Sequence, residues 1–389
     1  MPIRGKAFIA GAYEHPRREI PDLTLAEIHA QVAVGALADA GLALGDVDAY
    51  FCDSQAPGLG GLGMAEYLGL RCRYTDTTET GGSSYIAHVG HAAAAIAAGK
   101  CDVALITLAG KPRSGGDAPG GGDVFRSAPE AAFELVWGAT IPANYALAAR
   151  RHMHEFGTTS AQLAEIKVAA SLHAQHNPNA LLRAPVTVEQ VLDSPMVADP
   201  LHRLDCCVIT DGGGALLVVR PEIARDLART CVKVLGHGEA IKHTDNGRVD
   251  LTYTGAVWSG PAAFAEAGVT PADIDYASIY DSFTITVLET IEDLGFCAKG
   301  EGGRFVTDGA LVAPFGKLPF NTDGGGLCNN HPANRGGMTK VIEAVRQLRG
   351  EANAPVQVPD CKIALAHGTG GTISTRMGSA TVILGRADA

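Results

Sequence analysis

The chain has 389 residues, of which 46% are hydrophobic and 19% charged, so its composition is globular and its length exceeds what one hydrophobic core usually supports. The net charge of −11 argues against a general binder of nucleic acid or of a bilayer surface, because both need a basic surface. Nine cysteines, an odd number without a CxxC motif, argue against a disulfide framework or a zinc site and favour a reduced, cytoplasmic protein.

Neither a signal peptide nor a membrane span is expected. The N-terminal stretch MPIRGKAFIAGAYEHP has no long apolar core and no cleavage site. The longest apolar stretch, residues 85–109, is interrupted by His88, His91, Lys100 and Asp102. We therefore expect no contact with a membrane.

The first elements are those of an alternating α/β chain. ALADAGLALGDVDAYF, from Ala36, predicts the end of a helix, a short link with an acidic cap, and a strand. A loop containing Gly81 to Ser84 then leads into a predicted buried helix over 83–98 and a strand over 102–110. Small residues at a helix start let a ligand approach free backbone N–H groups, so this turn is a candidate binding site.

The middle of the chain has a different texture. The glycine- and proline-rich residues 111–127 predict a surface loop, and two helices with polar faces follow. We interpret 111–205 as an insertion that covers the active face of the first half. The i, i+2 spacing of His152 and His154 places them on different helix faces, which favours a solvated helix over a metal site. The pair Cys206-Cys207 lies in an apolar run and is expected in the core.

The same order of elements then returns. AFAEAGVTPADIDYAS, from Ala263, matches the segment from Ala36, with Asp46 and Asp48 repeated at an offset of 227 as Asp273 and Asp275. A glycine-rich turn, a helix over 338–349 and a strand over 362–371 follow. We expect two duplicated α/β halves, 1–235 and 236–389, whose helices beginning near 83 and 332 are buried side by side.

Five motifs, in this order and spacing, resemble the thiolase superfamily. They are GGSSYIAHVGHAAAAIAAGKCDVALI, DCCVITDGGGALLVV, IYDSFTITVLETIEDLGFCAKGEGG, NTDGGGLCNNHPANRGGM and HGTGG. The similarity covers nearly the whole chain and is greatest to the branch of sterol-carrier-protein thiolases and thiolase-like lipid-transfer proteins. It implies a five-layer αβαβα sandwich made of two similar halves, usually dimeric.

The resemblance also implies roles for individual residues. His331 matches the histidine that helps form the oxyanion hole for a thioester enolate at a helix start, and Tyr280 stands where related enzymes carry Asn or His. His367 falls where typical thiolases have their second cysteine, the base, and an imidazole pKa near 6.5 suits that task. The remaining candidates for oxyanion or substrate binding are Gly82, Ser83, Cys328, Asn321 and Gly370.

Each of these residues also has a purely structural interpretation. His331 can cap its own helix, and Tyr280 and His367 can simply end their strands. Cys328 is the only cysteine in a reactive-looking loop but is not at a family nucleophile position, so it can equally be a filler.

The acyl-accepting cysteine of typical thiolases is missing from this pattern. Its position, counted back from Gly99, is Gly82, and Ser83 needs an adjacent base to replace it. The parts that remain, an oxyanion hole and a base, suffice for retro-aldol cleavage of a 3-hydroxyacyl-CoA, as in the cysteine-less, tyrosine-bearing aldolase branch. That branch tends to have tyrosine where this chain keeps His331-Pro332, so acyl transfer or thiolysis by a non-standard route stays open.

Other functions and partners follow from the same resemblance. A non-catalytic acyl-CoA-binding subunit stays possible, whereas a ketosynthase-like enzyme would also need the missing cysteine. The substrate is expected to be a coenzyme A thioester, with no tightly bound cofactor and no metal. A homodimer is expected, and the family often adds a small companion protein with an OB-fold and a zinc ribbon.

Overall fold

The computed structural model describes residues 2–115, 135–138, 140–245, 248–332, 336–373 and 375–388. Most of the loop expected over 111–127 therefore lies outside the described residues. In the described ranges, no helix is both long enough and apolar enough to cross a bilayer.

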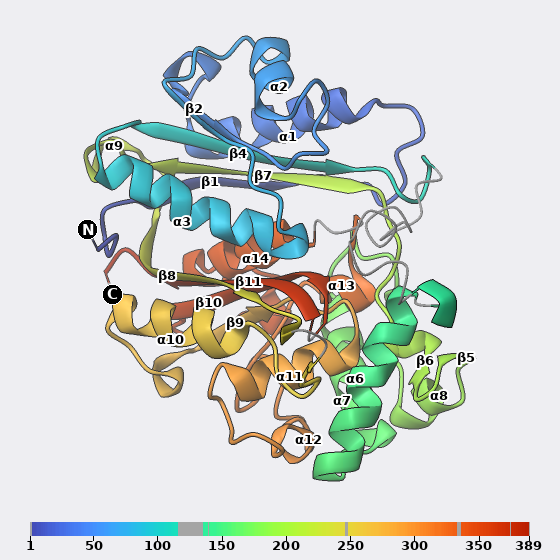
Figure 1. Cartoon of the computed structure of the whole chain (residues 1–389). Helices are drawn as coiled ribbons and strands as arrows, with labels where there is room; N and C mark the ends of the chain where they lie inside the picture. Colours follow the sequence, from blue (N-terminus) through green and yellow to red (C-terminus); the bar gives the residue numbers. More distant parts are fainter. Residues whose placement is uncertain are drawn as a thin grey trace.

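Nine strands form one mixed sheet in the order β3-β2-β4-β7-β1-β8-β11-β10-β9. The sheet is continuous only because β1 pairs with β8 through two residue pairs, Phe8 with Lys233 and Ile9 with Val232. Figure 1 shows that the two parts of the sheet on either side of this junction lie one above the other. The strands are β1 (Phe8–Glu14), β2 (Ala49–Phe51), β3 (Tyr74–Asp76), β4 (Val103–Gly110), β7 (Gly212–Val219), β8 (Val232–Lys242), β9 (Tyr276–Ile279), β10 (Ile363–Thr372) and β11 (Thr375–Gly385).

Helices complete five layers around the two parts of the sheet (Figure 1). The central layer consists of α3 (Ser84–Ala97) and α14 (Gly337–Arg349), which contact each other. The outer layer on one side holds α1 (Leu25–Ala40) and α2 (Gly61–Tyr67), and the other outer layer holds α10 (Ala256–Ala267) and α11 (Thr284–Asp293). The expected αβαβα sandwich with two buried helices side by side is confirmed.

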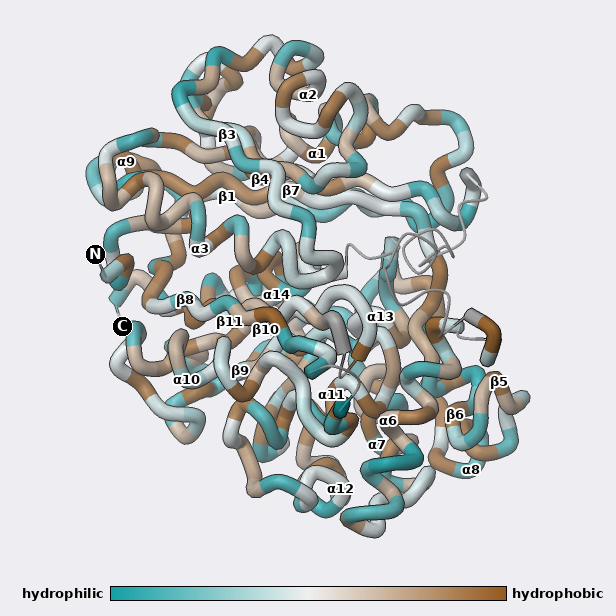
Figure 2. The backbone as a smooth tube through the Cα atoms, viewed as in Figure 1, coloured by the Kyte–Doolittle hydropathy of each residue, from teal (hydrophilic) through white to brown (hydrophobic). Residues whose placement is uncertain are grey.

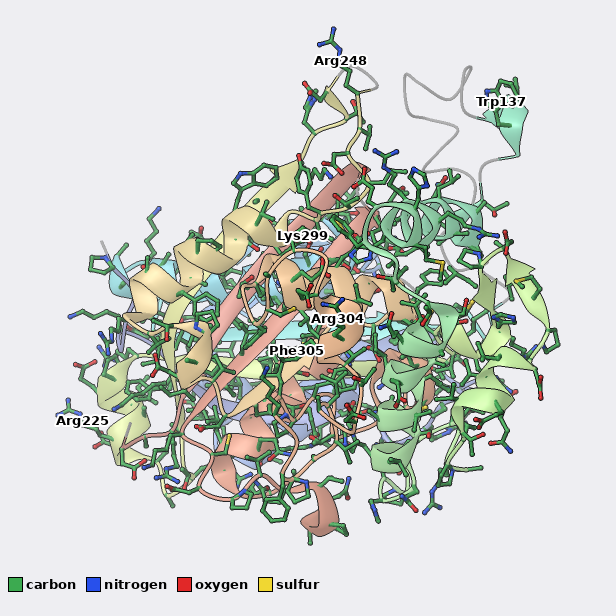
Figure 3. All side chains as sticks on the ribbon, turned by 90° about the horizontal axis from the view of Figure 1, so that it is seen from below. Trp137, Arg225, Arg248, Lys299, Arg304 and Phe305 are labelled. Atoms are coloured by element: carbon green, nitrogen blue, oxygen red, sulfur yellow. The ribbon has the colours of Figure 1, made fainter. Side chains whose placement is uncertain are left out.

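The remaining elements lie at the edges of these layers. Figure 3 views the molecule from the side of α10 and α11, where Lys299 and Arg304 are labelled. The helices are α6 (Ile141–Phe156), α7 (Ser160–Ala174), α8 (Val188–Leu192), α9 (Pro221–Asp226), α12 (Gly302–Phe305) and α13 (Gly325–Cys328), and a two-stranded ribbon joins β5 (Met196–Ala198) to β6 (Leu201–His202).

The repeated aspartates perform the same task in both halves. The carboxylates of Asp46 and Asp273 each accept the backbone N–H three residues earlier at 2.8 Å, which closes a 3₁₀ turn. Asp48 accepts the N–H of Val103 at the start of β4, and Asp275 accepts that of Ile363 at the start of β10, both at 2.9 Å. The carboxylates thus join each short strand to its parallel neighbour, and the duplication read from the sequence is confirmed.

The core is apolar on both sides of the central helices. In Figure 2 the strands β1 and β4 are mostly brown, the colour of hydrophobic residues. Ile86, Val89 and Met338 from the central helices belong to the same buried cluster as Ile106 of β4 and Ala366 of β10. The two halves therefore share one core. The boundary expected at 235/236 falls inside β8, which begins at Val232.

Candidate active site

A pocket of about 250 Å³ opens where the start of α3, the ends of β9 and β10, and the start of α6 meet. Its polar lining is Tyr145, Cys206, Cys207, Tyr280, Ser282, His331 and Thr369. Its apolar and glycine lining is Gly82, Ile141, Pro142, Val197, Ile209, Phe283, Gly370 and Gly371. Among the described lining residues there is no Asp, Glu, Lys or Arg, so the chemistry that these residues support depends on neutral donors and on backbone dipoles.

Tyr280 and His331 form the closest polar pair of the pocket. The Tyr280 hydroxyl lies 2.8 Å from His331 Nε2, and the rings meet edge-on with centroids 5.4 Å apart. Burial lowers the pKa of His331 to about 4 and raises that of Tyr280 well above its ordinary value. Both groups are therefore neutral at pH 7, and the pair can pass a proton along its hydrogen bond.

The loop that carries His331 is held by the first half of the chain. The backbone N–H of His331 donates to Thr210 Oγ1 at 3.0 Å, and Asn330 Nδ2 donates to Glu14 Oε1 at 2.6 Å. Burial alone would raise the pKa of Glu14, but Arg18 and Arg346 lower it to about 2, so Glu14 stays ionised. His331 itself precedes α14 and does not start a helix, contrary to the expectation of a helix beginning near 332.

A buried ion pair supports Tyr280 from behind. Its neighbour Asp281 accepts from Lys340 Nζ at 2.7 Å, and neither side chain of this pair is more than 1% exposed. The same carboxylate accepts the N–H groups of Gly326 and Leu327 at the start of α13. These bonds tie the end of β9, α13 and α14 together, which fixes the pocket wall on which Tyr280 and His331 lie.

Three glycines beside the pocket lie so close to neighbouring atoms that a side chain would not fit at any of them. A Cβ on Gly82 would lie 2.4 Å from both Thr369 O and Tyr280 Cε2. A Cβ on Gly337, at the start of α14, would lie 1.9 Å from Gly82 O, and one on Gly370 would lie 1.6 Å from Thr80 O. Glycine is therefore required at all three positions, and the starts of α3 and α14 meet beside Tyr280.

Ser83 does not face the pocket. Its hydroxyl donates to Thr80 O at 2.7 Å and lies 3.0 Å from Thr80 Oγ1, and the side chain is 1% exposed. No basic side chain contacts this hydroxyl among the hydrogen bonds of the described residues. Within the described ranges, Ser83 therefore has no activating group.

His367 lies on β10 two residues before Thr369, outside the pocket lining. Its Nδ1 is 2.8 Å from Thr381 Oγ1, which in turn is 3.0 Å from Ser259 of α10. Nε2 has no hydrogen-bond partner in the part of the chain that the structure describes, and burial lowers the pKa to about 3. His367 is not among the residues that line the pocket, so its role as a base beside the substrate stays a prediction. Its backbone carbonyl instead accepts the N–H of Tyr280 at 3.0 Å.

Cys328 and Asn321 also lie behind the pocket wall. Cys328 Sγ is 3.1 Å from Lys167 Nζ of α7, and burial raises the pKa of the thiol. Asn321 bonds both the N–H and the carbonyl of Ile279 at 2.8 Å, so it fixes the end of β9. Of the eight residues named from the sequence, the structure brings Tyr280, His331, Gly82 and Gly370 to the pocket and leaves His367, Ser83, Cys328 and Asn321 outside its lining.

Several pocket residues were missed by the sequence reasoning. Cys206 and Cys207 line the pocket and are not confined to the core, and burial raises the pKa of Cys206 to about 12. Tyr145 and Ser282 were not singled out, although Ser282 belongs to the YDSF motif and Tyr145 to the helix PANYALAARRHMHEFG. The apolar residues before Tyr145 were the available signal, since helix positions i and i+4 share one face.

The histidines of the middle segment are structural. His152 is buried and lies between Glu292 Oε2 at 3.0 Å and Thr158 Oγ1 at 2.8 Å, whereas His154 is exposed. Their different faces are confirmed, but the expectation of a solvated helix is wrong for His152. His173 is also buried, and its Nε2 accepts the N–H of Ala313 at 2.8 Å.

With this geometry established, the chain can be compared with known proteins. Residues 238–386 match the family described as thiolase C-terminal domain-like. An acetyl-CoA acetyltransferase of Methanothermobacter thermautotrophicus is 35% identical over 370 residues, which cover 92% of this chain and 94% of that protein. The chain belongs to the thiolase superfamily.

Other similar proteins indicate the branch of the superfamily to which the chain is most similar. A steroid side-chain-cleaving aldolase of Thermomonospora curvata is 35% identical over 88% of this chain and 90% of its own. A 17-hydroxy-3-oxo-4-pregnene-20-carboxyl-CoA lyase of Mycobacterium tuberculosis is 36% identical over 84% of this chain and 87% of its own. The solved structure of an Ltp2-ChsH2(DUF35) aldolase matches with a TM-score of 0.87 and 32% identity, covering 99% of this chain and 98% of that one. The resemblance to the sterol-carrier-protein thiolase-like branch is confirmed.

Proposed function

We propose that this thiolase-superfamily enzyme is an acyl-CoA lyase, which cleaves a 3-hydroxyacyl-CoA by a retro-aldol reaction without a covalent acyl-cysteine. The observation that carries this proposal is the contact between Gly82 and Tyr280. The Tyr280 ring occupies the space that a side chain at position 82 would need, because a Cβ there would lie 2.4 Å from Cε2. A nucleophile at the family position and this tyrosine exclude each other.

The reaction needs one proton to leave a hydroxyl group and one to reach carbon. Tyr280 takes the proton of the substrate 3-hydroxyl while it gives its own proton to His331 Nε2, 2.8 Å away. The Cα–Cβ bond then breaks, the former hydroxyl carbon leaves as a ketone or aldehyde, and the electron pair becomes a thioester enolate. The proton held by the pair returns to Cα, which gives the shortened acyl-CoA, so no proton is gained or lost overall.

The environment of His331 suits a proton that is held only briefly. Burial favours the neutral imidazole, while the Asp281 carboxylate favours the protonated ring and Lys340 opposes it. The family role of His331 in an oxyanion hole would leave its Nε2 free for substrate oxygen, whereas Tyr280 takes that nitrogen here. We therefore assign the pair to proton transfer. The neutral pocket gains most from donors when negative charge develops on the enolate.

The apolar wall supports a bulky apolar acyl group as the substrate. Ile141, Pro142, Phe283, Val197 and Ile209 form this wall, and Val197 and Ile209 remain 48% and 44% exposed at its rim. Burial of such side chains under a ligand contributes roughly 25 cal/mol for each Å² of apolar surface. The relatives named as a steroid side-chain-cleaving aldolase and a pregnene carboxyl-CoA lyase are consistent with this class.

A direct test compares two substrate panels. The purified protein, alone and with candidate companion proteins, is incubated with 3-hydroxyacyl-CoAs and with 3-ketoacyl-CoAs plus free coenzyme A, and products are identified by mass spectrometry. We expect a shortened acyl-CoA and a ketone or aldehyde from the first panel. After quenching, peptide mapping of residues 81–84 is expected to show no acyl adduct. Turnover of the 3-ketoacyl panel alone would overturn the proposal.

Acyl transfer is the second candidate, favoured by the identity to the Methanothermobacter acetyl-CoA acetyltransferase. It needs an activated nucleophile, but the pocket thiols of Cys206 and Cys207 have raised pKa values because they are buried. A stoichiometric acyl adduct on either thiol would favour this candidate. Binding of acyl-CoA without turnover in either panel would favour a non-catalytic subunit.

Assembly is also part of the proposal. A small OB-fold, zinc-ribbon companion is supported by the Ltp2-ChsH2(DUF35) aldolase, whose name contains two proteins. A homodimer is proposed from the superfamily resemblance. Co-purification and analytical ultracentrifugation with and without the companion test both assemblies.

A further inference from the structure

Tyr145 lines the pocket but lies outside the motifs that resemble the superfamily. It lies at the start of the second turn of α6, and the helix is capped by the Thr140 hydroxyl, which accepts the N–H of Ala143 at 3.3 Å. Residues 141, 142 and 145 all line the pocket, as expected for neighbours on one helix face. Tyr145 is only 4% exposed, so α6 places its phenol inside the pocket wall and away from bulk solvent.

The ring of Tyr145 is held in place independently of its hydroxyl. It stacks on Phe283 with centroids 4.2 Å apart and an interplanar angle of 29°. Such stacking fixes the direction in which the hydroxyl points, and it would persist in a phenylalanine variant. Ser282 also lines the pocket and lies close enough to the phenol to lower its pKa slightly against the larger effect of burial. Ser282 Oγ is itself 3.1 Å from Thr286 Oγ1 of α11, so the serine is also anchored.

Tyr145 and Tyr280 are close enough to affect each other. Burial raises the pKa of Tyr145 to about 12, and Tyr145 is among the groups that keep the pKa of Tyr280 high. Both phenols therefore remain protonated donors at neutral pH, and the described part of the cavity lining carries no Asp, Glu, Lys or Arg. Tyr280 is already bonded to His331, whereas the polar neighbour of the Tyr145 phenol is Ser282.

We propose that Tyr145 is a further catalytic residue, whose phenol donates a hydrogen bond to the oxygen of the thioester enolate, with Ser282 as its positioning residue. This inference rests on the proposed function, since the enolate is the intermediate of that reaction. The three aromatic residues have different chemical roles. The Tyr280–His331 pair accepts and returns a proton, and Tyr145 holds negative charge without transferring its own proton. A neutral donor that is already held in place is effective at this task because little reorganisation is needed as charge develops.

The test begins with Tyr145→Phe, which removes one oxygen and keeps the stack on Phe283. With a 3-hydroxyacyl-CoA substrate we expect kcat to fall by about 10²-fold while KM changes less than about threefold, because the bond strengthens as the enolate forms. Tyr276→Phe is the matched control. It removes a buried phenol hydroxyl outside the pocket lining, and we expect kcat to stay within about twofold of the parent. Ser282→Ala is expected to lower kcat by less than Tyr145→Phe.

A binding measurement separates this inference from the proposed function. A coenzyme A thioether carrying a nitronate group mimics the thioester enolate and requires no turnover. We expect Tyr145→Phe to weaken nitronate binding at least tenfold while binding of a plain acyl-CoA changes less than about threefold. Equal loss of both ligands, or a kcat within about threefold of the parent in a folded variant, would overturn the role of Tyr145. A parent that binds the nitronate tightly but cleaves no 3-hydroxyacyl-CoA would overturn the proposed reaction and leave the donor role supported.

Discussion

The two central helices occupy equivalent places in the duplicated halves but are built differently. Helix α3 contains no Asp, Glu, Lys or Arg, and most of its residues are small, buried and apolar. Helix α14 carries Lys340, Glu343, Arg346 and Arg349, and the first two are as buried as the core. The two helices thus occupy equivalent positions in the duplicated halves, but the charged residues that hold the pocket lie on α14 alone of the two.

The charges of α14 reach both halves. Lys340 pairs with Asp281 beside Tyr280, and Arg346 pairs with Glu14 of β1 at 2.9 Å. Arg349 pairs with Asp39 of α1 at 2.8 Å. A buried pair is costly to break, because the remaining partner is left charged in a poor solvent. Helix α14 therefore fixes the halves and the pocket together through its charges, whereas α3 is held mainly by the packing of small apolar residues.

Removing the charge of Lys340 is expected to cause the largest loss of the stability that α14 provides. Lys340→Met leaves Asp281 buried and without its cation, so we expect the free energy of unfolding to fall by about 3–5 kcal/mol in urea titrations. The control is Arg304→Met, since that arginine is 80% exposed in its pair with Glu301, and we expect a change within about 0.5 kcal/mol. A loss below about 1 kcal/mol for Lys340→Met would show that α14 is held by packing alone.

Tyr280 stands where the starts of the two helices meet, and its hydroxyl is expected to matter for rate. Tyr280→Phe should lower kcat by about 10²–10³-fold, or about 2.7–4 kcal/mol, with a smaller change in KM. Steady-state kinetics measures this effect on a 3-hydroxyacyl-CoA that the parent protein cleaves in the substrate panel. A kcat within about threefold of the parent, in a variant that stays folded, would make Tyr280 structural.

The pH dependence of stability tests what α3 contributes to the fold. His91 of α3 bridges Asp76 Oδ2 of β3 at 2.6 Å and Glu239 Oε2 of β8 at 2.9 Å, and these hydrogen bonds raise its pKa to about 9. Because the folded pKa exceeds the unfolded value of 6.5, the stabilisation is fully present below about pH 6.5 and is lost as pH rises through about 9. We expect His91→Gln to flatten the unfolding free energy between these pH values. An unchanged slope would mean that another group titrates.

The smallest effect is expected at His367. Its side chain faces Thr381 and α10, so His367→Gln should leave kcat within about threefold of the parent. The pH profile of kcat/KM should likewise keep its shape. A loss above about 100-fold with unchanged thermal stability would return the role of base to this histidine.

The fold was predictable from the sequence because its signals are local and repeated. The aspartates at offset 227 mark the same turn and strand in each half, and they make equivalent hydrogen bonds in the structure. The pocket was predictable only where a motif carried it, as with Tyr280 and His331. The position of His367 relative to the pocket was not predictable, because a motif alone does not show where along β10 the pocket lining begins; Thr369 and Gly370 line it and His367 does not. Tyr145 was missed because it comes from the segment between the repeats.

The place of β7 in the sheet has a consequence for synthesis on the ribosome. This strand lies between β4 and β1, yet its residues 212–219 come about a hundred residues after β4. Until they emerge, β1 and β4 of a nascent chain lack their shared partner and present unpaired edges, which favour pairing with other chains. The sheet of the first half therefore cannot form from β1 and β4 alone during synthesis. Contacts between residues so far apart in the sequence also form slowly. Expression at low temperature or with chaperones that cover exposed strands should raise the yield of folded protein.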